Sequence, residues 1–343
     1  IQTAIELLDE IFAFRQPADN TVNVYFRTHR YIGGGDRREI SALVWYVLRR
    51  YGRLRRVVGK APTGREAALA ALHYQGAAVE TLFDGEKYSP APLTAAEREM
   101  LEKLPAELPD AVAECPDWLR GRIDDADIRA MVDEASLDLR VNTLKMTRED
   151  VLKQLAQAGI KAEKTPYSPV GVRVNGRVNV TALPVYTDGM VEIQDEGSQI
   201  VSLLTQAAAG QVVIDWCAGG GGKTLALSAM MDAKGTLYAA DANVKRLRDL
   251  PERAGRAGAN NVILLNDYNN LKMYDLVLID APCTGTGTWR RSADARWRMS
   301  PEQSAQIIKT QREILDKACS RVKKGGRLFY ITCSLDRAEN EDQ

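Results

Sequence analysis

The 343-residue sequence predicts an α/β fold in its second half, where buried strands and helices alternate along the chain. Short apolar and β-branched segments recur between residues 211 and 331, and each ends at a turn or at a polar residue. Such strand–helix alternation indicates a parallel, doubly wound sheet with right-handed crossovers. Two other patterns precede it, first an all-helical region and then a small α+β region.

Composition and charge exclude several classes of protein. Lys+Arg and Asp+Glu both number 46, so the net charge is zero and indicates no particular partner. The five cysteines form no C-x-x-C pair and the only histidines are His29 and His73, which argues against a disulfide framework and a metal site. No apolar run is long enough to span a membrane, and no secretory signal is visible. We expect a reduced, cytoplasmic enzyme that needs no metal and acts as a monomer.

The length predicts several domains, because one core seldom organises more than about 250–300 residues. We place a helical domain at 1–124, an α+β platform at 125–190 and a catalytic domain at 191–343. The chain starts at Ile1 rather than at methionine, and it ends in the polar run Ala338–Gln343. We therefore expect a fragment whose last domain is incomplete at its C-terminal end.

The first domain is predicted to be helical. Apolar residues recur at helical spacing in Ile1–Phe14 and in Asp36–Tyr51. Gly33–Gly35 interrupts the chain before the second of these, for which Asp36 is the expected N-cap. Arginine is dense nearby: Arg27, Arg30, Arg37, Arg38, Arg49, Arg50, Arg53, Arg55 and Arg56. A solvated helix face and an RNA-contacting surface both explain this density.

The platform mixes strands and a helix. Leu137–Leu144 alternates as a strand does, and Thr147–Ile160 is an amphipathic helix with Thr147 as its N-cap. Val170–Val174 and Val178–Ala182 are predicted as short strands.

The catalytic domain has the clearest pattern. Strands are predicted at Gln211–Trp216, Thr236–Ala240, Val262–Leu265, Tyr274–Ile279 and Arg327–Ile331. Helices are predicted at Glu196–Ala209 and at Pro301–Val322. Two more follow the first two strands, one after Thr224 that ends at Met231 and one after Asp241 that ends at Ala257. The last helix has Ser300 as N-cap with Gln303 completing a capping box, and Gly325-Gly326 is its expected end. Because carboxyl ends of parallel strands meet at one edge, the polar residues after them predict a cofactor and catalytic crevice.

A glycine-rich turn, Cys217–Thr224, joins the first of these strands to a helix. A P-loop requires glycine where this chain has Cys217, and a dinucleotide fingerprint requires glycine where it has Thr224. S-adenosylmethionine is the third candidate. Glycines let the backbone approach its amino-acid end, Asp241 after the second strand would bond the ribose, and Asp267 after the third would bond the adenine amino group. These features occur in order and favour S-adenosylmethionine.

The strand Tyr274–Ile279 stops at Asp280-Ala281-Pro282-Cys283, where proline cannot continue the hydrogen-bonded ladder. An acid and a thiol therefore lie at its carboxyl end. The loop that follows alternates cations with indoles: Trp289, Arg290, Arg291, Arg296, Trp297 and Arg298. This composition is typical of a surface that meets nucleic acid through phosphate pairing and base stacking. A surface loop closed by two packing tryptophans explains it as well.

Three motifs, Asp215–Thr224, Asp280–Gly287 (DAPCTGTG) and Thr332-Cys333-Ser334, together resemble the RNA cytosine-5 methyltransferases of the Nop2/Sun family, near the bacterial RsmB (Fmu) branch. The resemblance covers at least Leu137–Gln343. It implies a Rossmann-like S-adenosylmethionine-dependent methyltransferase domain, an RRM-like platform and, before them, an all-helical, NusB-like RNA-binding domain. The family usually has Ala-Pro where this chain has Gly219-Gly220, a looser turn with the same backbone access.

By this resemblance, Cys333 adds to carbon 6 of cytosine, which lets carbon 5 attack the methyl group. A base then removes the carbon 5 proton, and Cys283 assists breakdown of the adduct. Asp280 holds or protonates ring nitrogen 3, and Lys223 helps at the cofactor and base site. The target base must leave its stack. The expected cofactor contacts are Cys217, Ala218, Gly219, Gly220, Gly221, Gly222, Lys223, Asp241, Arg246, Asp267 and Asp280.

RNA is the expected partner, with small-subunit ribosomal RNA as substrate and transfer RNA as the alternative. Two other classes stay open: a P-loop-like nucleotide hydrolase, and a catalytically silent RNA-binding assembly factor, which would need neither Cys283 nor Cys333. A DNA-type cytosine methyltransferase would use Cys283 as the nucleophile. Cys217 and Cys319 are predicted to be small core residues.

Overall fold

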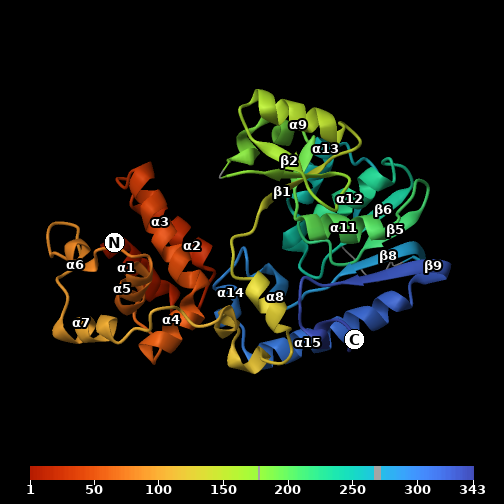
Figure 1. Cartoon of the computed structure of the whole chain (residues 1–343). Helices are drawn as coiled ribbons and strands as arrows, with labels where there is room; N and C mark the ends of the chain where they lie inside the picture. The colour runs from red at the N-terminus through yellow and green to blue at the C-terminus, as the bar shows by residue number, and fades with distance from the viewer. Residues whose placement is uncertain (177, 266–271) are drawn as a thin grey trace. The chain divides into compact units, whose positions relative to one another are not determined.

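The computed structural model describes residues 1–176, 178–265 and 272–343 (Figure 1). The chain forms two compact units. One consists of Ile1–Glu134, Thr284–Gln306 and Cys333–Gln343, and the other of Ala135–Cys283 and Ile307–Thr332. Cys283 is therefore the last residue of a segment of the second unit, and Cys333 begins a segment of the first. In the described ranges, none of the helices combines the length and apolar character required to cross a bilayer.

The first unit is helical in its N-terminal segment. Its helices are α1 (Gln2–Ile11), α2 (Ala18–Thr28), α3 (Gly34–Arg49), α4 (Tyr51–Val58), α5 (Gly64–Tyr74), α6 (Val79–Leu82), α7 (Ala95–Glu102), α8 (Asp125–Ala130) and α14 (Ala295–Arg298). Short 3-10 turns are η1 (Ala111–Glu114), η2 (Asp117–Leu119), η6 (Thr286–Thr288) and η7 (Arg337–Glu339). The apolar faces of α1, α3 and α5 meet in one core that buries Leu8, Val47 and Leu69 completely. The predicted all-helical N-terminal region is confirmed.

The N-terminus of α3 differs from the prediction. The helix begins at Gly34 with Gly33 as N-cap, so the expectation that Asp36 caps it is wrong. Asp36 lies in the first turn instead, where its negative charge faces the positive end of the helix dipole. Glycine at the cap position leaves the backbone free to enter the helix earlier than the apolar pattern indicates.

The cation- and indole-rich segment is packed into the first unit. Trp289 and Arg296 are each 1% exposed, and the Arg296 guanidinium lies 4.8 Å from the centroid of the Trp289 ring. Burial lowers the pKa of Arg296 to about 10, and the Glu114 carboxylate opposes that shift. Trp297 packs edge-on against Tyr51. The expectation of a nucleic-acid surface is therefore wrong for Trp289 and Arg296, because the same composition also makes a cation–π pair that closes a core.

The second unit contains an antiparallel four-stranded sheet of order β2-β3-β1-β4. The strands are β1 (Leu137–Val141), β2 (Ala162–Lys164), β3 (Gly171–Val174) and β4 (Val191–Ile193), accompanied by α9 (Arg148–Gln157), η3 (Val180–Ala182) and α10 (Pro184–Thr187). The Thr147 hydroxyl accepts the Asp150 N–H, which confirms Thr147 as the N-cap of α9. The predicted strand at Val178–Ala182 is wrong, because a 3-10 turn stands there.

The same unit contains a parallel five-stranded sheet of order β7-β6-β5-β8-β9, which confirms the predicted α/β fold. Its strands are β5 (Val212–Asp215), β6 (Thr236–Ala240), β7 (Val262–Leu265), β8 (Tyr274–Asp280) and β9 (Val322–Ile331). Its helices are α11 (Glu196–Leu204), α12 (Gly222–Met230), α13 (Leu250–Ala257) and the larger part of α15 (Pro301–Cys319), whose residues up to Gln306 belong to the first unit, with η4 at Val244–Leu247. Val213 packs with residues of α12 and Ile214 with residues of α15, so helices cover both faces.

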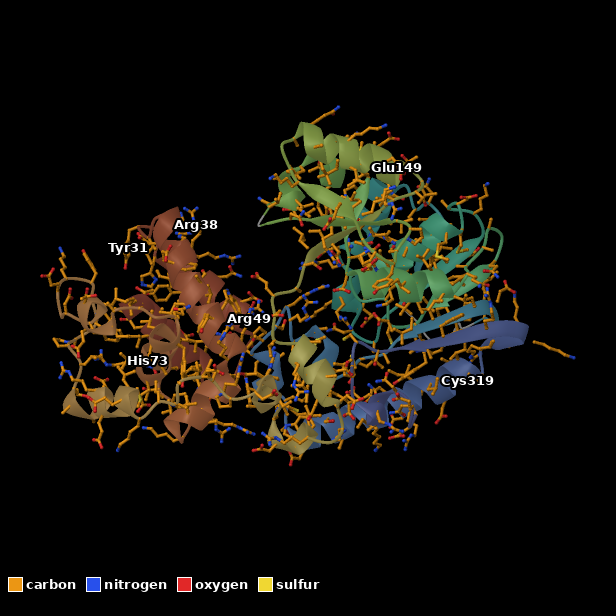
Figure 2. All side chains as sticks on the ribbon, in the orientation of Figure 1. Tyr31, Arg38, Arg49, His73, Glu149 and Cys319 are labelled. Atoms are coloured by element: carbon orange, nitrogen blue, oxygen red, sulfur yellow. The ribbon has the colours of Figure 1, made fainter. Side chains whose placement is uncertain are left out.

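The end of α15 differs from the prediction. The Ser300–Gln303 capping box is confirmed, with Ser300 N–H donating to Gln303 Oε1 (2.9 Å). The helix nevertheless ends at Cys319, and Gly325-Gly326 lies inside β9 rather than stopping the helix. These glycines occupy the interval where the register between β8 and β9 shifts, and Gly325 has a φ of +80° that suits glycine. Cys319 is exposed (Figure 2), so the prediction that it is a core residue is wrong.

Candidate active site

The glycine-rich turn between β5 and α12 has a left-handed backbone, which favours glycine, at two positions. Gly219 and Gly221 have φ values of +53° and +84°. A Cβ on Gly221 would stand 2.3 Å from Leu250 Cδ1, and one on Gly219 would stand 2.8 Å from Arg246 Nη2. Ala218 N–H donates to a carbonyl of β6, which ties the turn to the neighbouring strand. The turn therefore presents bare backbone at the carboxyl end of the sheet.

Asp241 connects this turn to the segment that follows β6. Its side chain is buried, and its Oδ2 accepts the Gly219 N–H (2.9 Å) and Nη1 of Arg246 (3.2 Å). Oδ1 accepts the Asn243 N–H (2.8 Å). The structure thus brings together Gly219, Asp241 and Arg246, three of the expected cofactor residues. Asp267, which is also among the expected cofactor residues, lies outside the described residues.

Cys217 is half-buried in the turn. Burial raises the pKa of its thiol well above the ordinary value, and the Asp215 carboxylate adds to the rise. A thiol held protonated is a poor nucleophile, so the side chain contributes packing.

Lys223 and Asp280 form an ion pair at the same carboxyl edge of the parallel sheet. Lys223 Nζ in the first turn of α12 lies 2.7 Å from Asp280 Oδ2 at the end of β8. The lysine side chain is 12% exposed and the aspartate 34%, so a ligand at this edge can reach the carboxylate. An ion pair this sheltered is weakly screened by salt.

Asp215 interacts electrostatically with both members of that pair. Sequence reasoning did not single it out as a separate site residue. Its carboxyl group is fully buried and its Oδ2 accepts the Thr224 hydroxyl (2.7 Å). Burial, with a smaller contribution from the charge of Asp280, raises the pKa of Asp215 to about 7, although the Thr224 hydrogen bond lowers it. The signal that could have found it is that β5, like β6 and β8, leads into an acid.

The turn that carries Cys283 is fixed by α15. Gln311 is fully buried, and its Nε2 donates to the Pro282 carbonyl at 2.8 Å. Ala281 N–H donates to the Ile331 carbonyl (2.9 Å), which extends the pairing of β8 with β9 beyond Asp280. Cys283 itself is partly buried. Sequence spacing gave no signal for Gln311, because helix and turn are distant along the chain.

Cys333 lies in the first unit, against the loop Thr284–Thr288. Gly287 N–H donates to the Cys333 carbonyl (2.9 Å), and a Cβ on Gly287 would stand 2.8 Å from that oxygen. A Cβ on Gly285 would lie 4.0 Å from the Cys333 sulfur. Cys333 is exposed. The glycines of the TGTG motif therefore let the loop pass close to the thiol of the TCS motif.

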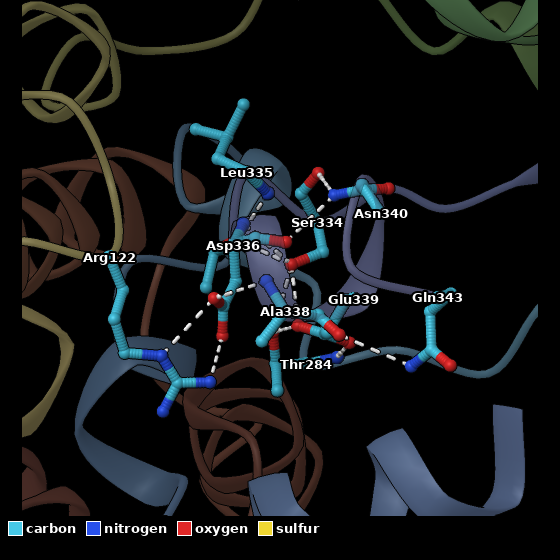
Figure 3. Close-up of polar contacts among 10 residues, drawn as sticks. Arg122, Thr284, Ser334, Leu335, Asp336, Ala338, Glu339, Asn340 and Gln343 are labelled. Atoms are coloured by element: carbon cyan, nitrogen blue, oxygen red, sulfur yellow. Dashed lines mark hydrogen bonds and ion pairs between the residues drawn. The ribbon is translucent and has the colours of Figure 1, made fainter. Parts of the chain in front are cut away.

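Behind this loop, Glu339 and Asp336 form a buried acidic hub (Figure 3). Glu339 Oε2 accepts the Thr284 N–H (2.9 Å), and Oε1 accepts the hydroxyls of Thr284 and Ser334. Asp336 forms an ion pair with Arg122. Sequence reasoning missed both acids, because Glu339 belongs to the polar run Ala338–Gln343 and Asp336 lies just before it, a composition typical of a disordered tail.

Two family models match parts of this chain. Residues 202–343 match the family described as 16S rRNA methyltransferase RsmB/F, and residues 116–181 match a Methyltr_RsmF/B-like, ferredoxin-like domain. A relative from Synechocystis sp., named "Probable ribosomal RNA small subunit methyltransferase B", is 33% identical over 66% of this chain and 55% of its own length. The chain spans about half the length of the curated relatives it matches.

Two solved structures are similar as well. A methyltransferase homolog protein from Pyrococcus horikoshii is 30% identical, with a TM-score of 0.56 over 68% of this chain and 74% of that chain. The crystal structure of PH0851 is 23% identical, with a TM-score of 0.73 over 99% of this chain and 88% of that chain, which shows a shared fold.

Proposed function

Since this chain belongs to the RsmB/F family of S-adenosylmethionine-dependent methyltransferases, we propose that it methylates carbon 5 of a cytosine in small-subunit ribosomal RNA. The observation that carries the proposal is the thiol of Cys333, exposed beside the loop that follows Cys283. RNA binding alone would need neither thiol nor the close glycine contacts around Cys333. A catalytically silent assembly factor is therefore the less favoured function.

The cofactor edge fits S-adenosylmethionine. The bare backbone at Gly219 and Gly221 leaves room for the amino-acid end of the ligand, and Asp241 offers a buried carboxylate for hydroxyl groups. Lys223 stands where a P-loop has its phosphate-binding lysine, but in this chain it is paired with Asp280. When bound, the cofactor supplies an electrophilic methyl group.

The chain's own groups would act on the base in a set order. The Cys333 thiolate adds to carbon 6, the electron pair of the 5,6 double bond moves into the ring, and ring nitrogen 3 takes the proton that Asp280 holds, which leaves an enamine with a nucleophilic carbon 5. After carbon 5 has been methylated, a base removes the proton from carbon 5. The electron pair of that bond re-forms the double bond between carbons 5 and 6, and the Cys333 sulfur leaves carbon 6 as a thiolate. Cys283 assists this release. Lys223 keeps Asp280 oriented at the sheet edge.

The test of the proposal is product analysis. The chain is incubated with small-subunit ribosomal RNA and methyl-labelled S-adenosylmethionine, and the RNA is digested to nucleosides for mass spectrometry. Label in 5-methylcytidine is the expected result. Label in another nucleoside would contradict the carbon 5 assignment, label only in a parallel transfer RNA sample would change the substrate, and RNA binding without label would favour the assembly factor.

Asp241→Asn is expected to weaken S-adenosylmethionine binding about tenfold or more, since a charge-assisted hydrogen bond contributes about 1.5–3 kcal/mol. The amide also loses the ion pair with Arg246. Isothermal titration calorimetry measures the affinity. Asp249→Asn is the matched control, an exposed acid paired with Arg248 in the same segment, and should bind normally. Normal binding by folded Asp241→Asn would remove Asp241 from the cofactor site.

A basic groove in the first unit supports RNA as the partner. It has a volume of about 690 Å³, and its lining includes Arg55, Arg56, Lys60, Arg120, Trp118 and Trp297. Lys60 pairs with Glu66, and Arg120 pairs with Asp117. Across the described ranges no carboxylate forms an ion pair with Arg55 or Arg56. Unneutralised cations beside indoles fit a single-stranded RNA segment, through phosphate contact and base stacking.

Replacing Arg55 and Arg56 together by Gln is expected to lower the affinity for a fluorescein-labelled dodecauridylate about tenfold and to reduce the salt slope by about 1–2. Fluorescence anisotropy at several salt concentrations measures both. Arg27→Gln with Arg38→Gln makes the same charge change at two exposed residues outside the groove, of which Arg38 is labelled in Figure 2. Equal losses of affinity in the two double variants would show that the total charge of the protein, and not the groove, determines RNA binding.

A further inference from the structure

One buried carboxylate holds the residue that follows each of the two motif cysteines. Thr284 comes directly after Cys283, and Ser334 comes directly after Cys333. Glu339 is 0% exposed, and it accepts the Thr284 N–H at 2.9 Å, the Thr284 hydroxyl, and the Ser334 hydroxyl at 2.5 Å. Figure 3 shows Thr284 and Ser334 converging on this side chain. Two motifs that are distant in the sequence therefore share one anchor.

The segment after Cys333 is folded so that Glu339 can reach back. Asp336 accepts the Ala338 N–H at 3.1 Å and starts the 3-10 turn η7, whose last residue is Glu339. Asn340 Nδ2 donates to the carbonyls of Ser334 (3.1 Å) and Asp336 (2.9 Å), which closes the turn. The Arg122–Asp336 ion pair fastens the turn to the rest of the first unit. The turn that carries Glu339 is therefore held by hydrogen bonds to backbone groups and by a side-chain ion pair.

We propose that Glu339 is a positioning residue that sets the backbone carrying both thiols, an inference that rests on the proposed function. The Thr284 N–H belongs to the same planar peptide as the Cys283 carbonyl, so Glu339 fixes the orientation of that peptide. The Ser334 hydroxyl bond holds the side chain of the residue next to the nucleophile, and Asn340 Nδ2 holds the Ser334 carbonyl. Catalysis by two thiols on one base requires their positions to be correct within less than about 1 Å.

Glu339→Gln keeps the size of the side chain and removes its charge and one acceptor. At saturating cofactor and RNA, methyl transfer is expected to fall about 100-fold, as misplacements of about 1 Å do. The KM for RNA should stay within about threefold, because the lost interaction is not a binding contact. Glu339→Asp, which keeps the charge and is one methylene shorter, should recover part of the rate.

Glu114→Gln is the matched control. Glu114 is also a fully buried carboxylate of the first unit, and it accepts the Gly52 N–H and pairs with Arg53. We expect this variant to lower the melting temperature while kcat stays normal well below that temperature. If Glu339→Gln behaves in the same way, with normal kcat, its role is structural and the proposal is overturned.

A second measurement does not depend on methyl transfer. The alkylation rates of Cys283 and Cys333 by iodoacetamide are followed by mass spectrometry in the unmutated chain and in Glu339→Gln. Both rates should change by about fivefold or more when the shared anchor is weakened, because thiol reactivity depends on local environment and access. Unchanged rates at both cysteines would overturn the inference, whereas absent RNA methylation in the unmutated chain would only refute the proposed function.

Discussion

The Cys283→Ser variant is expected to remain joined to RNA on a denaturing gel, whereas Cys333→Ser should run free of RNA. In the proposed reaction Cys333 makes the bond to carbon 6, and Cys283 acts only when that bond breaks. Methyl transfer to RNA should fall at least about 10³-fold in Cys333→Ser, because the nucleophile itself is removed. The gel is run with RNA and S-adenosylmethionine present.

Cys319→Ser is the control, because Cys319 is an exposed cysteine on α15 and should behave as the unmutated chain does. Trapping by Cys333→Ser alone would reverse the two roles and give the DNA-type arrangement. Trapping by neither variant, together with no label in RNA, would favour the RNA-binding factor.

Asp280→Ala is expected to slow methyl transfer about 10²–10⁴-fold, the range lost with a positioned acid or base. The substitution removes the group that holds ring nitrogen 3, and it leaves the sheltered Lys223 ammonium without its partner. Single-turnover rates at saturating RNA measure the loss. Asp275→Asn is the matched control, because Asp275 is also on β8 and pairs with Lys323 at 2.8 Å near the other end of the strand.

A double variant separates the two members of the pair. If Lys223 acts through Asp280, Lys223→Ala should cost much less in the Asp280→Ala background than alone. Additive losses would mean that Lys223 contacts cofactor or base independently, and a normal rate in Asp280→Ala would remove the carboxylate from the reaction.

The strands of the parallel sheet were predictable because each contains a short apolar run that ends at a turn or at a polar residue. β6 and β7 have the bounds expected from their apolar runs, Thr236–Ala240 and Val262–Leu265. The strands Ala162–Lys164 and Val191–Ile193 were not foreseen, since three residues carry no readable alternation and their neighbours set their pairing. The boundaries at residues 124 and 190 and the NusB-like character of the helices stay predictions.

Within the candidate site, the sequence predicted which residues lie at the ends of parallel strands better than it predicted which distant side chains meet. The glycine turn, Asp241 and Asp280 could be placed at one sheet edge because parallel strands end there together. Glu339 and Thr284 are 55 residues apart, and no spacing rule brings a polar tail onto a loop at that distance. Arg296 and Trp289 show the reverse error, because composition alone does not distinguish a binding surface from a buried cation–π pair.

The buried carboxyl group of Asp215 couples proton uptake to folding. Its pKa is raised to about 7 by burial, from an ordinary value of 3.8, so the native second unit holds a proton there that the unfolded chain releases between those values. The stabilisation from this group is complete below the unfolded pKa and is lost as pH rises through about 7. A rise in pH through about 7 therefore adds a negative charge that interacts with both Lys223 and Asp280.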